Sequence, residues 1–215
     1  MSEPATARSL VVLVADKDME QALLGLLERP ESLGIRPVAR YDIFVHPGRD
    51  SGCRTHCDGF LRNLQRRYAF ALVLFDLEGS GRDSTPRVDV ETEVERRLEA
   101  NGWKGRSASI ALDPELEVWV WSDSSEVDLV LGWSGASEPK LREWVRDQGF
   151  VLDDSGKPAR PKEALRAALR QVRKQPSSAL FRALARRVSL NRCTDPGLAK
   201  LTRVLRGWFP PGNAS

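Results

Sequence analysis

The chain has few of the residues on which several common classes of protein depend. Its 215 residues include only three cysteines and two histidines, so a disulfide framework is not expected. No apolar run approaches the length of a membrane span. The first ten residues also lack the apolar segment of a secretory signal. The sequence therefore predicts a cytoplasmic protein with reduced thiols and no membrane partner.

Several motifs of catalytic chemistry are missing as well. The sequence contains no Walker loop and no Gly-x-Gly-x-x-Gly fingerprint, and neither histidine lies in a recognisable nucleophile motif. These absences argue against P-loop NTPases, dinucleotide-dependent dehydrogenases and hydrolases with a catalytic triad. Zinc stays an alternative in one segment, although its spacing matches no standard zinc finger. Its candidate ligands are His46, Cys53, His56 and Cys57.

The chain does have three short apolar runs, at residues 10–14, 71–75 and 109–112. Runs of this length, rich in Val, Leu and Ile, are typical of strands that are buried on both faces of a parallel sheet. Helical periodicity between them, as in residues 18–28 and 90–99, indicates crossover helices. The sequence therefore predicts an α/β fold, a parallel sheet flanked by helices.

The chain divides into an α/β part and a helical part. Residues 1–122 are predicted to form an α/β domain, and residues 123–215 a basic, mostly helical cap packed on it. In the first part we expect a further strand over 38–45, a loop over 46–58 and a helix over 60–68. In the second part we expect helices over 138–148, 161–173, 177–188 and 196–208.

Charge is distributed unevenly along the chain. The net charge is +3, but residues 156–215 contain fourteen Lys and Arg against two acids. This segment therefore carries about +12, and the preceding residues about −9. A strong charge asymmetry of this kind indicates a nucleic-acid partner, although arginines on helices are often simply solvated.

Carboxylates follow each apolar run. Asp16 follows the first run, Asp76 and Glu78 follow the second, and Glu115 and Glu117 follow the third. The carboxyl ends of parallel strands line the ligand crevice of an α/β sheet, so we expect these acids to lie close together. Carboxylates in one place repel one another unless a proton or cation lies between them. Mg²⁺, or Mn²⁺ in its place, suits such oxygen ligands.

The acids divide into two sets by predicted role. We expect the metal ligands to be Asp16, Asp76, Glu78 and Glu117. We expect the catalytic residues, as ligands or as a base that positions water, to be Asp16, Glu115 and Glu117. An alternative stays open, because acids at strand ends also cap the helices that follow. Two lysines, Lys157 and Lys162, flank a proline-rich turn and are candidate phosphate-binding residues.

Three segments carry a family resemblance. They are Asp76-Leu77-Glu78-Gly79, Pro114-Glu115-Leu116-Glu117-Val118-Trp119, and Lys157-Pro158 followed by Pro161-Lys162. With them the chain resembles the Toprim domain, the metal-binding α/β module of topoisomerases, primases and related nucleases. More closely, it is similar to small Toprim-like bacterial proteins of antiphage defence, such as the component of a methylation-associated defence system. The resemblance implies a Toprim-like, Rossmann-like sheet and magnesium-dependent phosphodiester chemistry.

The chain departs from the Toprim pattern at functional positions. Asp16 stands where the family has glutamate, and the acidic pair is Asp-x-Glu rather than Asp-x-Asp. The only tyrosines are Tyr41 and Tyr68, and neither lies in a setting that indicates a nucleophile, which argues against strand passage. Two functions remain. One is cleavage or binding of nucleic acid by a metal-dependent protein of antiviral defence. The other is a non-catalytic subunit that binds nucleotide or DNA, or scaffolds other defence proteins.

Overall fold

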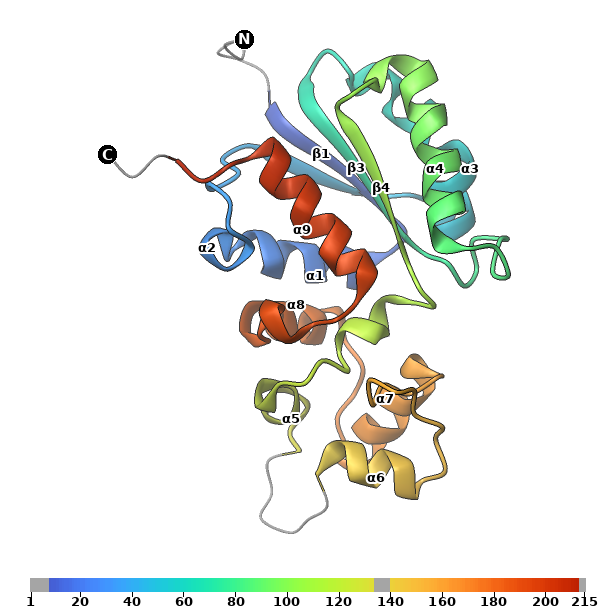
Figure 1. Ribbon diagram of the computed structural model, residues 1–215, viewed down its shortest axis with the longest axis vertical. Helices are drawn as coiled ribbons and strands as arrows, with labels where there is room; N and C mark the ends of the chain where they lie inside the picture. The colour runs from blue at the N-terminus through green and yellow to red at the C-terminus, as the bar shows by residue number, and fades with distance from the viewer. Residues whose placement is uncertain (1–7, 134–139, 213–215) are drawn as a thin grey trace.

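The computed structural model describes residues 8–133 and 140–212 and contains one four-stranded sheet (Figure 1). The strands are β1 (Arg8–Val14), β2 (Tyr41–Val45), β3 (Tyr68–Asp76) and β4 (Ser107–Leu112). All pairings are parallel and the strand order is β2-β1-β3-β4. The α/β class predicted from the apolar runs is confirmed. The start of the chain, where no signal segment is expected, lies outside the described residues.

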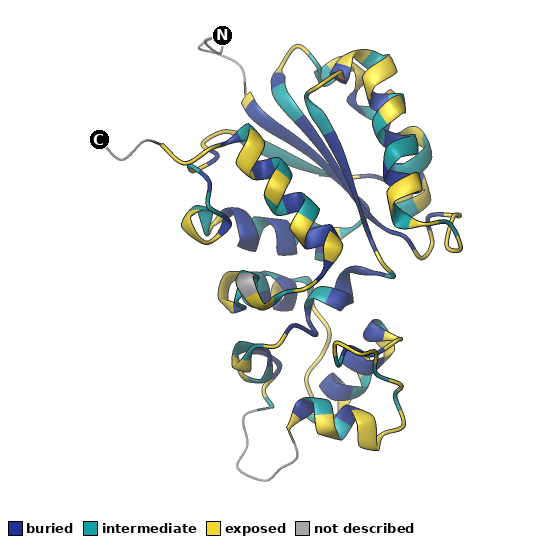
Figure 2. Ribbon diagram, viewed as in Figure 1, coloured by how far each residue is buried: buried dark blue, intermediate teal, exposed yellow. Residues whose placement is uncertain are grey.

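Helices cover both faces of the sheet (Figure 1). On one face lie α1 (Lys17–Leu27) and α9 (Pro196–Trp208), and on the other lie α3 (Arg49–Leu61) and α4 (Arg87–Leu98). The two central strands are consequently buried along their length (Figure 2). In β1, Leu10 through Val14 have no exposed surface. Double coverage explains why β1 and β3 are continuous apolar runs rather than alternating ones.

The helices between residues 125 and 171 extend the structure beyond the carboxyl end of the strands (Figure 1). After α1 come α2 (Pro30–Leu33), and later α5 (Ser125–Leu131), α6 (Leu141–Asp147), α7 (Pro161–Gln171) and α8 (Ser178–Arg187), with α8 packed on α1. The short helical turns are η1 (Arg62–Leu64), η2 (Glu99–Trp103), η3 (Leu116–Trp119) and η4 (Leu190–Arg192). The helix expected from residue 138 begins at Leu141, and Glu138 lies outside the described residues. The division at residue 122 stays a prediction.

Two predicted elements between β2 and β3 are wrong. The segment 46–58, expected to be a loop because of its glycines and polar residues, forms most of α3. Cys53, Cys57 and Leu61 recur one turn apart and are fully buried, and this stripe outweighs the poor helix propensity of the rest. The helix expected over 60–68 is replaced by the end of α3, η1 and the start of β3.

The structure also bears on membranes and on zinc. None of the helices in residues 8–133 and 140–212 has the length and apolarity that a membrane span requires. The zinc alternative gains no support there, because Cys53 and Cys57 pack in the core while His56 is exposed. Among the described residues these side chains do not form a group able to hold a metal ion.

Side chains from two helices occupy the outer edge of β4. The Ser109 and Ala111 N–H groups donate to Glu95 Oε1 and Glu91 Oε1, each at 3.0 Å. Lys200 Nζ, from α9, lies 3.1 Å from Glu91 Oε2 and 2.7 Å from Glu95 Oε1. Glu91 is 1% exposed. The edge strand is thus hydrogen-bonded by α4. Lys200 neutralises both carboxylates from the opposite face of the sheet, and Arg87 of α4 also pairs with Glu91.

Replacing Glu91 tests this arrangement. Glu91→Ala leaves the Ala111 N–H without its partner, and it leaves the partly buried Lys200 and Arg87 without part of their counter-charge. We expect the free energy of unfolding to fall by about 3 kcal/mol, measured by urea denaturation. The control, Glu99→Ala, removes an exposed glutamate at the end of the same helix. It should change the free energy of unfolding by less than about 0.5 kcal/mol. Equal effects of the two substitutions would contradict the role given to Glu91.

Candidate metal centre

The strand order places a ligand crevice at one position along the sheet. The chain passes from β1 to β2 on one side and then to β3 on the other, so the order reverses between β1 and β3. Ligands of open α/β sheets bind outside the carboxyl ends of the strands at such a reversal. Asp16 follows β1 and Asp76 ends β3. The topology therefore brings two of the predicted acids to this crevice.

Backbone pairing brings the third acidic segment to the same place. The pairing of β3 with β4 continues beyond the strands, because Leu77 N–H donates to Leu112 O at 2.8 Å and Glu78 N–H to Pro114 O at 3.0 Å. The chain then turns into η3, whose first N–H, on Leu116, donates to Asp76 Oδ1 at 2.8 Å. Asp76 thus fixes the start of η3 and the positions of the glutamates on either side of Leu116.

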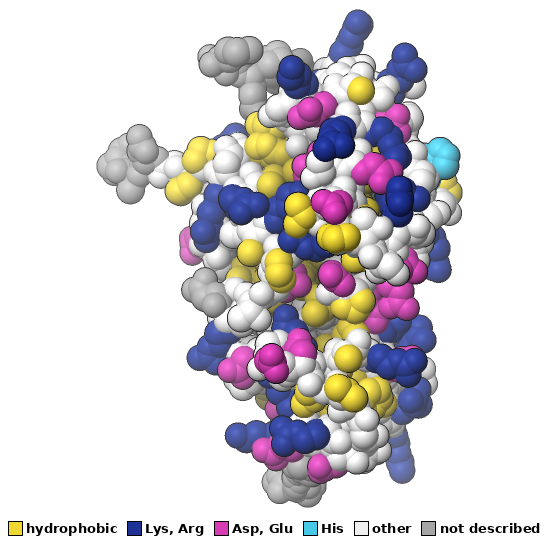
Figure 3. Space-filling view, turned by 45° about the vertical axis from the view of Figure 1, so that its right-hand side comes forward, with side chains coloured by type: hydrophobic (Ala, Val, Ile, Leu, Met, Phe, Trp, Pro, Cys, Tyr) yellow, Lys and Arg dark blue, Asp and Glu magenta, His cyan; other side chains and the backbone are white. Residues whose placement is uncertain are grey.

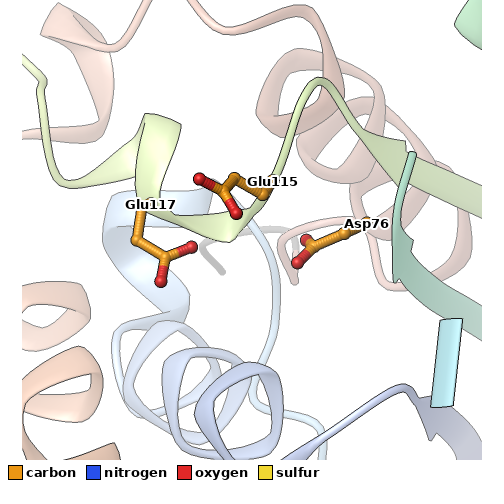
Figure 4. Close-up of side chains that lie close together, drawn as sticks. All are labelled: Asp76, Glu115 and Glu117. Carbon is orange, nitrogen blue, oxygen red and sulfur yellow. The ribbon is translucent and has the colours of Figure 1, made fainter. Parts of the chain in front are cut away.

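Asp76, Glu115 and Glu117 form a cluster of three carboxylates. One oxygen from each lies within 4.8 Å of the others, and each residue is only 6% exposed. Figure 4 shows the carboxylates of Asp76 and Glu117 facing each other, with Glu115 between them. Such a set of buried oxygen ligands could hold a metal ion. The sequence predicted the convergence of these three residues, and the structure brings them together.

A lysine from the helical part reaches this cluster. Lys162 is the second residue of α7, and its Nζ lies 3.0 Å from Glu115 Oε2 and 3.7 Å from Glu117 Oε1. Its backbone N–H also donates to Glu115 Oε1, at 2.9 Å. Glu115 therefore binds the first turn of α7 through both the side chain and the main chain of one residue. The Trp121 indole N–H, which donates to Pro161 O at 3.0 Å, fixes the same turn.

Burial and crowding alter the protonation of the cluster. Burial raises the pKa of Asp76 well above its usual value, and the nearby Asp50 and Glu117 raise it further. Burial also raises the pKa of Glu117 to about 7, although Lys162 opposes this shift. Burial alone would lower the pKa of Lys162, but Glu117 and Glu115 reverse the effect and raise it. The cluster holds protons that a divalent cation would displace.

A fourth acid, Asp50, contacts the cluster from α3. Its Oδ1 accepts the backbone N–H of Asp76 at 2.8 Å. Burial raises the pKa of Asp50, and Asp16 adds to the shift. The sequence places Asp50 in a predicted loop from which it could reach the metal site, but does not include it among the predicted ligands. Its place in the first turn of a helix that follows a strand end was the signal that could have identified it.

Three other predicted site residues lie outside the cluster. Asp16 caps α1, since its Oδ1 accepts the Met19 N–H at 3.0 Å. It is nonetheless close enough to raise the pKa values of Asp50 and Asp76. The Glu78 side chain is exposed. Lys157 is buried in the turn before α7, where its backbone N–H donates to Asp153 Oδ1 at 2.8 Å, and within the described ranges no ion pair joins it to the three carboxylates.

Comparisons with known proteins do not assign the chain to a family. No protein-family model, no curated protein and no solved structure matches it. The chemistry of the site must therefore be argued from its residues.

The raised pKa of Glu117 predicts how pH affects stability without metal. Its pKa is about 7 in the folded chain against 4.5 ordinarily, so the folded state holds a proton that the unfolded state releases. This contribution to stability is fully present below about pH 4.5 and is lost as the pH rises through 7. Glu117→Gln should remove the part of the decline in unfolding free energy that this residue causes. Urea denaturation in EDTA between about pH 4.5 and pH 7 measures it. Parallel curves for the variant and the wild type would contradict the assignment.

Proposed function

We propose that this chain is a cytoplasmic, Mg²⁺-dependent protein that acts on the phosphodiester backbone of nucleic acid in bacterial antiviral defence. One observation carries the metal-dependent part, which is the convergence of three buried carboxylates beyond the carboxyl ends of β3 and β4. The resemblance of the Asp76-Leu77-Glu78-Gly79 and Pro114-to-Trp119 segments to Toprim-like defence proteins supports the biological setting.

The donor set suits a hard divalent cation. All three side chains offer oxygen, and neither sulfur nor imidazole belongs to the group, which favours Mg²⁺ or Mn²⁺ over zinc. Asp76, Glu115 and Glu117 would hold the ion. When bound, such a cation polarises a phosphoryl oxygen and lowers the pKa of a bound water. Lys162, whose ammonium now neutralises two of the carboxylates, would then be available to a phosphate oxygen.

A non-catalytic role is the second candidate, and a specific contact favours it. Lys162 Nζ already lies within ion-pair distance of Glu115 and Glu117. A lysine in this position can serve as a permanent counter-charge, and the cluster would then join α7 to the sheet without turnover. The chain would in that case bind nucleotide or DNA, or scaffold partner proteins.

Metal binding tests the first candidate directly. We expect Mn²⁺ to bind the wild-type protein in calorimetry, with affinity that rises as the pH passes 7, because Glu117 and Asp76 must lose protons. Asp76→Asn keeps the shape of the side chain and should weaken binding by at least about tenfold. Glu78→Gln should leave affinity unchanged, since that side chain is exposed. Weaker binding by both variants would favour the ligand set predicted from sequence, which includes Asp76 and Glu78, and unchanged affinity of Asp76→Asn would contradict the metal centre.

Catalysis is tested by incubating the protein with single- and double-stranded DNA and RNA in Mg²⁺ or Mn²⁺. We expect cleavage that EDTA and Asp76→Asn both abolish. Cleavage that persists in purified Asp76→Asn protein would remove this site as its source. Metal binding without cleavage of any of the four substrates would support the non-catalytic candidate.

Lys162→Met separates the two candidates. The Lys162 side chain is 38% exposed, so solvent screens part of its effect, and we expect a loss of about 1–2 kcal/mol in the metal-free protein. If the cluster is a metal site, the variant binds Mn²⁺ more tightly, and saturating Mn²⁺ restores its thermal stability. If Lys162 is the permanent counter-charge, Mn²⁺ restores nothing. Lys104→Met removes an exposed lysine elsewhere and controls for the change in net charge.

A further inference from the structure

The overall excess of positive charge does not locate an interface by itself. On the face in Figure 3, Lys and Arg side chains lie over both the sheet part and the lower helical part, with acidic side chains among them. A surface that selects a polyanion should instead hold several cations without intervening acids. Such a surface occurs where the end of α7 and the chain to α8 meet.

Two adjoining hollows make up this surface. The first has a volume of about 400 Å³ and is lined by the end of α7 and the residues that follow it. The second, of about 710 Å³, is lined largely by α8 and shares Lys174 with the first. No acidic side chain of the described residues lines either hollow. We call this surface the basic groove, and its cations are Arg166, Arg170, Arg173, Lys174, Arg186 and Arg187.

The cations of α7 form a row that begins at the carboxylate cluster. Lys162, Arg166 and Arg170 are four residues apart, so they lie along one ridge of the helix at intervals of about 6 Å. Lys162 contacts Glu115 at one end of this ridge, and Arg166 and Arg170 line the first hollow at the other. The ridge therefore connects the metal centre to the basic groove.

Apart from Arg186, the arginines of the basic groove have no acidic partner in the part of the chain that the structure describes. Arg186 pairs with Glu28 at 3.0 Å, but no carboxylate in residues 8–133 or 140–212 lies within ion-pair distance of Arg166, Arg170 or Arg173, which are all exposed. An arginine ridge that no acid neutralises presents its full charge and its planar donor groups to the solvent.

Arg173 stands where the backbone favours a different residue. It has a φ of 55°, the left-handed conformation that follows many helices and that glycine usually adopts. Its N–H donates to Arg170 O at 3.0 Å and closes α7. An arginine gives the backbone no advantage in this conformation. Its exposed side chain instead adds a charge to the groove.

We propose that the basic groove binds the phosphate backbone of single-stranded nucleic acid. Cations that recur at a regular interval, with no acid between them, complement a linear polyanion better than a single acidic group. The first hollow lies along the end of α7 and the second between α5 and α8, so the groove follows the chain from α7 to α8. A flexible single strand can track such a charged surface more closely than a rigid duplex. From the groove, the strand would continue along α7 to the carboxylates. This continuation alone rests on the proposed function.

The test measures binding of short fluorescent oligonucleotides by anisotropy, in EDTA so that the metal centre plays no part. We expect Arg166→Gln/Arg170→Gln to weaken single-strand binding by about tenfold or more. The slope of log affinity against log salt should also fall by about 0.7 for each phosphate that the variant no longer neutralises. The matched control, Arg62→Gln/Arg66→Gln, removes two exposed arginines near the start of β3 and should change neither quantity.

Arg173→Gly distinguishes a binding role from a structural one. Glycine adopts a positive φ without strain, so this variant should be at least as stable to heat as the wild type. It should nevertheless bind the oligonucleotide more weakly, because it lacks the Arg173 charge. Tighter binding of duplex than of single strands, or equal loss of affinity in the control and groove variants, would overturn the proposal. If the groove binds the oligonucleotide in EDTA but the protein does not bind Mn²⁺, only the metal centre is refuted. If the protein binds Mn²⁺ but the groove does not bind the oligonucleotide, only the groove is refuted.

Discussion

Neutralising buried negative charge is the constraint on which the carboxyl end of the sheet depends. Three carboxylates lie within 4.8 Å of one another and almost out of contact with solvent. Such a group is stable only if protons, a cation or a basic side chain offset its charge. In this chain the raised pKa values of Asp76 and Glu117 favour bound protons, and Lys162 is the basic side chain. The arrangement of oxygens also suits a cation. The position of α7 follows from this requirement, because its first turn is bound to Glu115.

One helix links the two proposed activities. The amino end of α7 contacts the carboxylates, and its carboxyl end lines the basic groove. The groove alone would account for affinity without sequence preference, since phosphate contacts position a strand but do not read it. The carboxylates would account for chemistry at one point along that strand. Under both proposals, the separation of these roles along a single helix would account for a basic C-terminal segment and acidic strand ends in one chain.

Sequence patterns predicted the parts of the structure that depend on local rules. The runs at 10–14 and 71–75 gave β1 and β3, and parallel topology was enough to bring Asp76 to Glu115 and Glu117. Asp50 was left out of the predicted ligand set because the helix that holds it depends on tertiary burial of two cysteines among glycines and polar residues. The contact of Lys162 with Glu115 depends on how α7 docks, which no spacing encodes. Glu78 lies apart because the chain leaves strand geometry after Asp76, so residues two apart no longer share a face.

The hydrogen bonds at the border of β4 also limit how this molecule can associate with others. A parallel sheet has two lateral strands, here β2 and β4, and an additional strand can join only where main-chain donors and acceptors are free. Glu95 and Glu91 already occupy two outward donors of β4, the N–H groups of Ser109 and Ala111. Recruitment of a foreign peptide as a fifth strand, or self-assembly through continuous sheets, is therefore directed to β2. The α4 side of the molecule is protected from such assembly by its own side chains.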